Sequence, residues 1–190
     1  MNEKQLRYDK FFSETAKLSA KMSFCERRKV GAILTKDTRI ISNGWNGTVS
    51  GEDNCCEEDF GEVSDIEHRF LNIIKENDFE NEAKEYCSEY GLIFESIKKE
   101  DKKYKLKYRR PKIRTKNSVV HAEANAIAYA AKEGISTKGC SLYVTLSPCI
   151  NCANLIIQAG IKEVIYTESY RDTSGIDHLK KNNIAVKYLS

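Results

Sequence analysis

The chain has 190 residues, 41% of them hydrophobic and 31% charged, and a formal net charge of +3. These values are ordinary for one globular domain with a sizeable core. The charge is uneven, because residues 98–116 contain eleven Lys or Arg and two acids, about +9, which leaves about −6 elsewhere. This distribution argues against a nucleic-acid-binding surface spread over the whole fold.

The N-terminal stretch MNEKQLRYDK is charged and lacks the apolar segment of a signal peptide. No apolar run approaches the length of a membrane span. We therefore expect a cytoplasmic protein that does not use a membrane. The seven cysteines are an odd number. In the cytoplasm they are expected to be reduced thiols and metal ligands rather than a disulfide framework.

The first 47 residues predict a helix followed by two strands. The helix is expected over residues 3–22, and the strands over 30–35 and 39–42. A core-facing stripe along the helix is expected to comprise Tyr8, Phe11, Phe12, Thr15, Leu18, Ser19 and Met22. The GWNG stretch at residues 44–47 fits either a plain turn or a place where glycines let the backbone approach a ligand.

Residues 51–117 are harder to interpret. Helical patterning runs over 64–75 and over 78–99. The basic stretch that follows is typical of a solvated or partly disordered loop. Contact with the phosphate of a nucleotide or a nucleic acid is the functional alternative.

The most informative stretch runs from residue 119 to residue 160. His121, Glu123, Cys149 and Cys152 form the pattern H-x-E … P-C-x-x-C, which is the signature of zinc-dependent nucleobase deaminases. One His and two Cys provide three zinc ligands and leave a fourth position open for water. A glutamate two residues from the His is placed to handle the protons of that water.

The spacing of these residues also predicts their local structure. Cys149 and Cys152 share one helix face at i, i+3, with Ser147 as N-cap and Pro148 as first helical residue. The helix dipole then favours thiolates in the first turn. His121 and Glu123 can converge only if His121 lies at the start of its own helix.

The elements after this helix continue an alternating order. Strands are favoured by SLYVTL, which precedes Cys149 and Cys152, and by KEVIYTESY, which follows Gly160. Residues 175–182 favour a helix, and residues 184–189 favour a last strand. This order indicates an α/β protein with helices flanking a central sheet.

The stretches VGAILTKDTRIISNGWNG, HAEANAI and LYVTLSPCINCANLIIQAGIKEVIY together resemble the deoxycytidylate (dCMP) deaminase family, particularly its bacteriophage members. The similarity covers about residues 5–50 and 117–190. It implies a three-layer α/β/α cytidine-deaminase-like fold with a central five-stranded mixed sheet. Residues 1–190 would then form a single deaminase domain with an insertion at about 51–117.

The resemblance implies hydrolytic deamination of dCMP to dUMP and ammonia, which supplies dUMP for thymidylate synthesis. Zinc would lower the pKa of a bound water, and Glu123 would act as general acid and base toward the pyrimidine. The backbone carbonyl of Ser147 is a candidate acceptor for the amine. The N–H of Ala122, near a helix start, is a candidate donor to the base oxygen O2.

Further substrate contacts also follow from the resemblance. Asn46 is expected to bind the deoxyribose 3′-hydroxyl, and Tyr170 to stack on the base. Arg27, Arg28 or Lys29 is expected to meet the 5′-phosphate, and we favour Arg28 because a guanidinium forms the better fork.

The resemblance further implies a homo-oligomer, with a hexamer expected, allosteric binding of dCTP and dTTP, and the host cytoplasm as location if a phage encodes the chain. Two alternatives stay open. An RNA or single-stranded DNA editing deaminase is supported by residues 98–116 alone, so nucleic acid is an unlikely partner. A non-catalytic, zinc-stabilised binding protein is disfavoured by the intact Glu123.

A second, structural zinc is the last expectation. Some phage relatives hold such a zinc with Cys at positions like Cys25 and Cys55, plus a His and a Glu shortly before the catalytic His. Here Val119 and Val120 occupy that place. His68 would therefore have to substitute, and Cys56 or Cys87 could complete a tetrahedral set.

Overall fold

A computed structural model describes residues 3–59, 66–71, 79–89, 91–100, 103–109 and 113–189 of the chain. The chain divides into two compact units. The first unit joins residues 1–56 with 115–190 and is called the core unit. The second, residues 57–114, is called the inserted unit and falls within the expected insertion at about 51–117.

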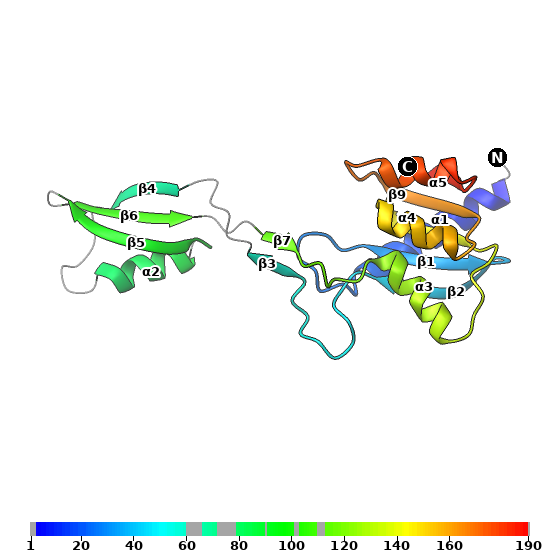
Figure 1. Cartoon of the computed structure of the whole chain (residues 1–190), viewed down its shortest axis with the longest axis horizontal. Helices are drawn as coiled ribbons and strands as arrows, with labels where there is room; N and C mark the ends of the chain where they lie inside the picture. The colour runs from blue at the N-terminus through cyan, green and yellow to red at the C-terminus, as the bar shows by residue number, and fades with distance from the viewer. Residues whose placement is uncertain are drawn as a thin grey trace. The chain divides into compact units, whose positions relative to one another are not determined.

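The core unit is built on a mixed sheet of five strands in the order β10-β9-β8-β1-β2 (Figure 1). The strands β8, β9 and β10 run parallel, whereas β1 is antiparallel to both β8 and β2. This arrangement confirms the predicted five-stranded mixed sheet. The strand bounds are Gly31–Lys36 for β1, Arg39–Trp45 for β2, Ser141–Leu146 for β8, Glu163–Glu168 for β9 and Ala185–Tyr188 for β10.

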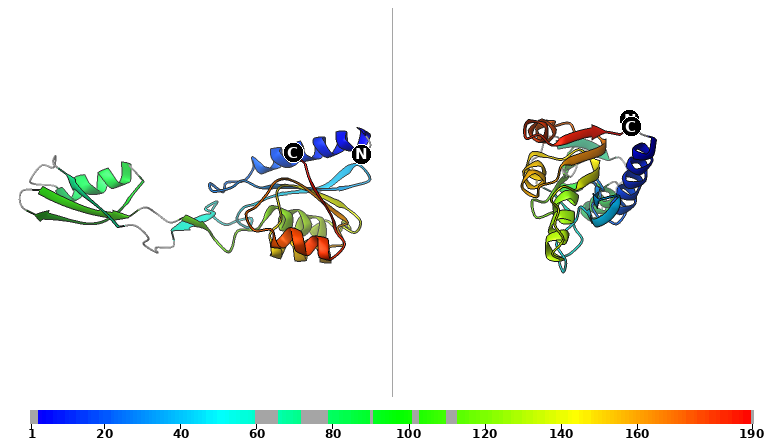
Figure 2. Two further views of the ribbon diagram at one scale, coloured as in Figure 1. Left: turned by 90° about the horizontal axis from the view of Figure 1, so that it is seen from above. Right: turned by 90° about the vertical axis from the view of Figure 1, so that its right-hand side faces the viewer.

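Helices cover both faces of this sheet, as the end-on view in Figure 2 shows. Side chains alternate between the faces along each strand. Ile33, Tyr143 and Ile165 pack with α1 on one face, and the neighbouring strand residues pack with the other helices on the opposite face. The three-layer architecture is thereby confirmed. The helix bounds are Glu3–Ala20 for α1, Ala122–Lys132 for α3, Ile150–Gln158 for α4 and Ser174–Lys181 for α5.

Two glycines let helices lie directly on the sheet. A Cβ on Gly31 would lie 2.1 Å from the carbonyl oxygen of Ala16 in α1. A Cβ on Gly44 would lie 2.4 Å from the carbonyl oxygen of Ala122 in α3. Both distances are far below van der Waals contact, so only glycine fits these positions.

The predicted stripe on the first helix is partly wrong. Phe12 and Ser19 are buried, but Phe11, Leu18 and Met22 are 57–60% exposed. The helix instead buries small and polar side chains, namely Asp9, Ser13, Ala16 and Ala20. Gly31 lets the backbone of α1 come close to the sheet, so the face of α1 that packs on the sheet needs small residues. The prediction relied on large apolar residues and therefore selected the wrong face of the helix.

The inserted unit contains more strand than the sequence predicted. The expected helix at 64–75 is replaced in its described part by strand β4 (Ile66–Leu71), and the expected helix at 78–99 comprises α2 (Phe79–Glu89) and strand β5 (Ile93–Glu100). The expected basic loop forms β6 (Lys103–Arg109), which pairs with both strands in an antiparallel sheet ordered β4-β6-β5.

The pattern of the basic stretch explains why it forms a strand and not a loop. Leu106 and Tyr108 are buried in a cluster with Ala83 and Cys87 of α2. They alternate with lysines in KYKLKYR, so the period is two, as in a strand with one covered face. The density of charge concealed this alternation.

Two short strands complete the described structure. The strand β3 (Glu57–Asp59) pairs with β7 (Ile113–Thr115), and Arg114 Nε donates to Glu58 Oε1 at 2.9 Å. Within the part of the chain that the structure describes, no helix has the length and apolar character that crossing a membrane requires.

Candidate zinc and substrate site

Three side chains from two helix starts converge on one point of the core unit. His121 Nδ1 lies 3.6 Å from Cys149 Sγ and 3.4 Å from Cys152 Sγ. His121 is exposed, Cys149 half-buried and Cys152 buried. Among the described residues, this is the only such group of potential metal ligands whose atoms lie within 4.8 Å of one another.

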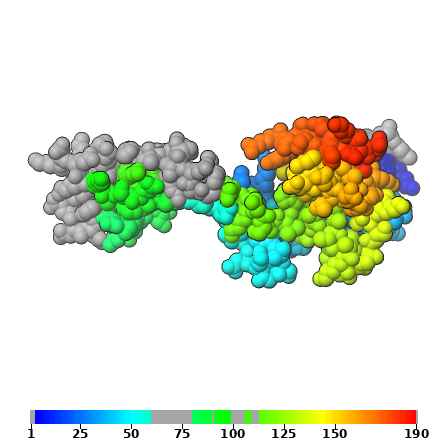
Figure 3. All heavy atoms as spheres, viewed as in Figure 1, coloured from blue at the N-terminus to red at the C-terminus, as the bar shows by residue number. Residues whose placement is uncertain are grey.

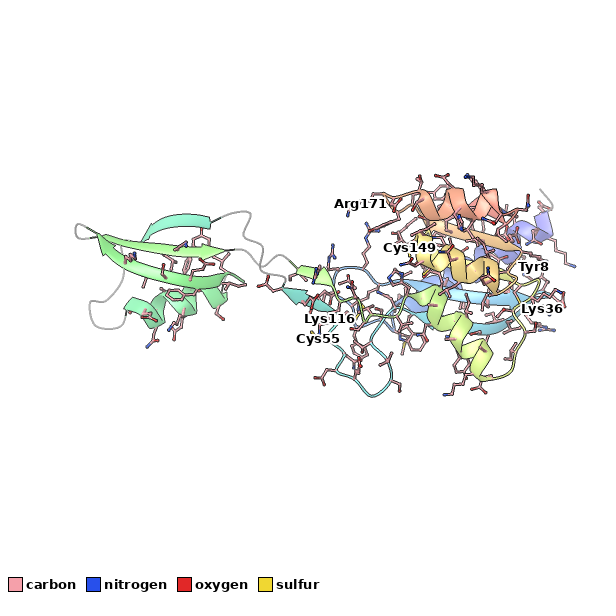
Figure 4. All side chains as sticks on the ribbon, in the orientation of Figure 1. Tyr8, Lys36, Cys55, Lys116, Cys149 and Arg171 are labelled. Carbon is pink, nitrogen blue, oxygen red and sulfur yellow. A yellow bond between two sulfur atoms is a disulfide. The ribbon has the colours of Figure 1, made fainter. Side chains whose placement is uncertain are left out.

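The backbone around these ligands was predicted in part. His121 is the N-cap of α3, with extended dihedral angles of φ −73° and ψ 153°, as its convergence with Glu123 required. The N-cap of α4 is Cys149 rather than the predicted Ser147. Cys149 therefore lies at the cap, and Cys152 lies in the first turn of α4. Figure 4 labels Cys149 at this helix start.

The spacing of the ligand atoms fits zinc. Zn–N and Zn–S bonds of about 2.0–2.1 and 2.3 Å at a tetrahedral angle place N and S roughly 3.5 Å apart. The two observed distances, 3.6 and 3.4 Å, bracket this value. The donor set of one imidazole and two sulfurs is also one that zinc accepts, with a fourth position for a small ligand.

The two sulfurs differ in how readily they lose their proton. Hydrogen bonds from the side chains of Cys152 and His121 lower the pKa of Cys149 to about 3. The hydrogen bond to Cys149 and burial raise the pKa of Cys152. The hydrogen bond to Cys149 raises the pKa of His121 against the effect of burial. One thiolate is therefore already favoured where a metal would need its ligand deprotonated.

Glu123 lies in the first turn of α3 and is only 4% exposed. Burial raises the pKa of its carboxyl above the ordinary value. A buried carboxyl whose pKa is raised accepts and holds a proton more readily than an exposed one. This is the property expected of the proton-transferring group.

Ala122 is the first residue of α3, where backbone N–H groups have no acceptor within the helix. Ala122 is fully buried, and its carbonyl oxygen lies against Gly44 of β2. A backbone N–H at this position can donate to a group outside the helix, as the expected contact with the base requires. That contact stays a prediction.

The residues expected to bind the base and the phosphate are linked to the ligand segment. Ser147 is buried, and its Oγ accepts a hydrogen bond from the backbone N–H of Tyr170 at 2.7 Å. The Arg28 guanidinium lies over the Tyr170 ring, 5.9 Å from its centroid. Arg28 and Tyr170 are thus neighbours, although they are far apart in the sequence.

The side chain of Asn46 is hydrogen-bonded to the backbone of the residues before β1. Its Oδ1 accepts from the N–H of Val30 at 2.7 Å, and its Nδ2 donates to the carbonyl of Arg28 at 2.9 Å. The carboxamide therefore holds residues 21–30, which connect α1 to β1 and are called the Arg28 loop. Its expected contact with the deoxyribose 3′-hydroxyl stays a prediction.

Two residues that support the segments around the zinc ligands were not predicted from the sequence. A Cβ on Gly175 would lie 2.1 Å from the carbonyl oxygen of Pro148, so α5 backs the segment that carries Cys149. Asn125 Nδ2 donates to the carbonyl of Trp45 at 3.0 Å and ties α3 to the GWNG stretch. A glycine in a predicted first turn and an asparagine inside a helix are both common, so neither position stood out in the sequence.

The expected second metal site is not assembled from the described side chains. Cys25 is joined to Cys56 by a disulfide, Cys55 is exposed, and the side chain of His68 lies outside the described residues. Zinc on Cys25 would require this disulfide to be reduced. The second zinc therefore stays a prediction.

Comparisons with known proteins agree with this geometry. Residues 6–168 match the family model described as the cytidine and deoxycytidylate deaminase zinc-binding region. The deoxycytidylate deaminase of Enterobacteria phage T4 is 36% identical over 171 residues, which cover 89% of this chain and 82% of that protein. The deoxycytidylate deaminase of Mycobacterium phage D29 is 31% identical and is covered to 93% of its length.

A solved structure is similar over the whole chain. The dCMP deaminase of cyanophage S-TIM5 in complex with dCMP and dUMP is 30% identical, with a TM-score of 0.65. The alignment covers 100% of this chain and 99% of that one.

Proposed function

Because the chain belongs to the cytidine and deoxycytidylate deaminase family, we propose that it hydrolyses dCMP to dUMP and ammonia. The observation that carries this proposal is the zinc-spaced group of His121, Cys149 and Cys152, with buried Glu123 beside it. The phage relatives named as dCMP deaminases support dCMP as the substrate.

The residues of the chain divide the chemistry among them. Zinc, when bound by His121, Cys149 and Cys152, supplies the Lewis acidity that makes water a nucleophile near neutral pH. Glu123 would accept a proton from the water that attacks C4 and give it to N3. It would then accept the remaining proton of the oxygen now bonded to C4 and give it to the amine, which leaves as ammonia. The Ala122 N–H would bind O2 of the base, and the Ser147 carbonyl would accept from the amine.

Recognition of the nucleotide is assigned to the Arg28 loop. Arg28 is exposed, yet its guanidinium is held near Tyr170, and Asn46 fixes its backbone. A guanidinium beside a stacking ring suits the 5′-phosphate and base of one nucleotide. Arg27 and Lys29 are also exposed and are the alternatives.

Loss of the cytosine absorbance band tests the substrate. The protein is incubated with dCMP, dCTP, deoxycytidine and a cytosine-containing oligonucleotide in separate reactions. Turnover of dCMP well above the other three supports the proposal. Turnover of the oligonucleotide would favour an editing deaminase, and no turnover by the zinc-loaded protein would favour a non-catalytic binding protein.

The Arg28→Ala variant tests the phosphate site. We expect KM for dCMP to rise by about ten- to a hundredfold while KM for deoxycytidine changes little, because only dCMP carries the phosphate. Lys29→Ala changes the alternative cation, so the comparison of the two variants shows which of them contacts the phosphate. Equal effects of Arg28→Ala on both substrates would place the phosphate elsewhere.

We also infer a homo-oligomer, with a hexamer expected, that responds to dCTP and dTTP, and a location in the cytoplasm. These inferences rest on the family resemblance. Light scattering of the zinc-loaded protein measures the oligomer. Assays at subsaturating dCMP with each nucleotide added measure the regulation.

A further inference from the structure

The disulfide between Cys25 and Cys56 lies at a junction of the core unit. Cys25 follows α1, and Cys56 follows the segment after β2, 31 residues later in the chain. Both cysteines are buried: Cys25 is 1% exposed and Cys56 is 0% exposed. Val119 packs against them. The disulfide therefore joins two segments that the sheet does not connect directly.

The Cys56 side of the disulfide leads to the metal ligand His121. The N–H of Lys116 donates to the carbonyl of Cys56 at 2.9 Å. Val120 and Gly47 exchange two backbone hydrogen bonds of 2.8 and 3.1 Å, and His121 follows directly. Cys55 and Lys116, labelled in Figure 4, lie in this region.

The Cys25 side leads to the Arg28 loop. Cys25 Sγ lies 3.8 Å from the carbonyl oxygen of Asn46. The side chain of Asn46 holds Val30 and Arg28 through the two hydrogen bonds described above. Arg28 in turn lies over Tyr170, which Ser147 anchors beside the metal ligands. Each of the two cysteines is thus connected, through a short series of contacts, to a segment that carries a zinc ligand.

We propose that Cys25 and Cys56 form a reversible redox modification site whose disulfide fixes the Arg28 loop and strengthens binding of the nucleotide phosphate. The modification itself stands on the geometry of the two cysteines. Its effect on the phosphate rests on the function proposed above.

The oxidation is a thiol–disulfide exchange. The Cys25 and Cys56 thiols give up two protons and two electrons as their S–S bond forms. A low-molecular-weight disulfide such as oxidised glutathione accepts them and is cleaved into two thiols. Reduction is the reverse reaction with two equivalents of the thiol.

The surroundings provide a route for the reagent. Residues 49–55, which lead into Cys56, are all exposed. Figure 3 shows this segment in cyan as a projection on the surface of the core unit. Local opening of such a segment uncovers Cys56 without unfolding the sheet.

The experiment equilibrates zinc-loaded protein with glutathione buffers of increasing ratio of oxidised to reduced form. Peptide mapping after thiol blocking measures the fraction of Cys25–Cys56 disulfide, and KM and kcat are measured for dCMP and for deoxycytidine. On full reduction we expect KM for dCMP to rise about three- to tenfold, with little change for deoxycytidine, because a misplaced loop weakens contacts to the phosphate.

Matched variants separate this site from the zinc ligands. Cys55→Ser removes the neighbouring exposed thiol and should respond to the buffers as the wild type does. Cys25→Ser and Cys56→Ser should show the kinetics of the reduced wild type at every buffer ratio. An oxidant response that persists in both variants would arise at the zinc ligands and would overturn the proposal.

Mapping of the wild type keeps the modification testable if a variant fails to fold. Absence of a Cys25–Cys56 peptide under oxidising buffer would overturn the modification site. A disulfide that forms fully without changing KM for dCMP would overturn its role in binding. If no substrate were turned over, the proposed function would fail while the mapping still decided the modification.

Discussion

At the scale of single residues, Glu123 is the position where metal binding and proton transfer can be separated. We expect Glu123→Gln to keep zinc and the fold, because the three ligands are untouched and the amide has the same size as the carboxyl. Turnover should fall by about 10²–10⁴-fold, since the amide cannot carry the proton. Zinc analysis and dCMP assays check this, and more than a tenth of the wild-type rate would exclude Glu123 as the proton carrier.

A second residue-scale feature is the buried carboxylate of Asp9, on the face of the sheet away from the zinc site. Asp9 is 2% exposed and accepts hydrogen bonds from Gln5 at 2.8 Å and Tyr143 at 2.9 Å, and it pairs with Lys187. Burial alone raises the pKa of Asp9, but the hydrogen bonds from Lys187, Gln5 and Tyr143 outweigh it and lower the pKa overall. The ionised form is therefore favoured by folding.

This network predicts a pH-dependent loss of stability in Asp9→Asn. Because the folded pKa is lowered, the contribution is fully present above the unfolded pKa of about 4 and is lost as pH falls through the folded value. We expect Asp9→Asn to lower the free energy of unfolding by about 1–3 kcal/mol at pH 7. The difference from wild type should shrink below pH 4. Urea unfolding at both pH values measures it, and a difference independent of pH would contradict the ionic explanation.

At the scale of elements, the contact between β2 and α3 positions the helix start that carries His121 and Glu123. A Cβ on Gly44 would lie 2.4 Å from the carbonyl of Ala122 and 2.5 Å from the N–H nitrogen of Ala126, both backbone atoms. Gly44→Ala must therefore displace α3, at a cost of about 1–3 kcal/mol in stability. Because His121 and Glu123 begin this helix, kcat should fall as well, by up to about 10²-fold.

Gly47→Ala is the matched control for stability. A Cβ on Gly47 meets no atom within 4 Å, and its φ is not in the left-handed region. We expect its thermal midpoint to match the wild type. Equal destabilisation by the two variants would show that the close contact between Gly44 and α3 does not explain the loss, because Gly→Ala by itself restricts the unfolded chain and favours folding.

The elements themselves could be predicted where their patterns are local. β8 occupies the predicted SLYVTL, and His121 begins its helix because its convergence with Glu123 demands it. Prediction from the sequence pattern failed where contacts between distant parts of the chain determine the structure. The side of α1 that is buried depends on Gly31 of β1, and the strands of the inserted unit are concealed by lysines that alternate with Leu106 and Tyr108.

At the scale of the whole molecule, the zinc site could be predicted because each of its residue types has few other uses at that spacing. The partners of Asn46 and Cys25 could not, because a carboxamide and a thiol accept many partners. Their choice follows from how the loop after α1 lies against the sheet. The sequence indicated that Asn46 matters but not that its side chain would hold the backbone of Arg28.

The division of the chain into two units leads to the last prediction. The zinc-ligand group and Glu123 belong to the core unit, while the inserted unit has its own apolar cluster around Leu106. The N–H of Lys116 donates to the carbonyl of Cys56, so the chain leaves and re-enters the core unit at nearly one point. A linker of about three residues can close such a gap.

We therefore expect a variant with residues 57–114 replaced by Gly-Ser-Gly to fold, bind one equivalent of zinc at its catalytic site and turn over dCMP within about tenfold of the wild-type rate. Circular dichroism, zinc analysis and the absorbance assay check these outcomes. The same replacement combined with Glu123→Gln is the inactive control. Loss of zinc or of folding would show that the inserted unit is needed to form the core unit. Loss of turnover alone would show that it contributes to the reaction.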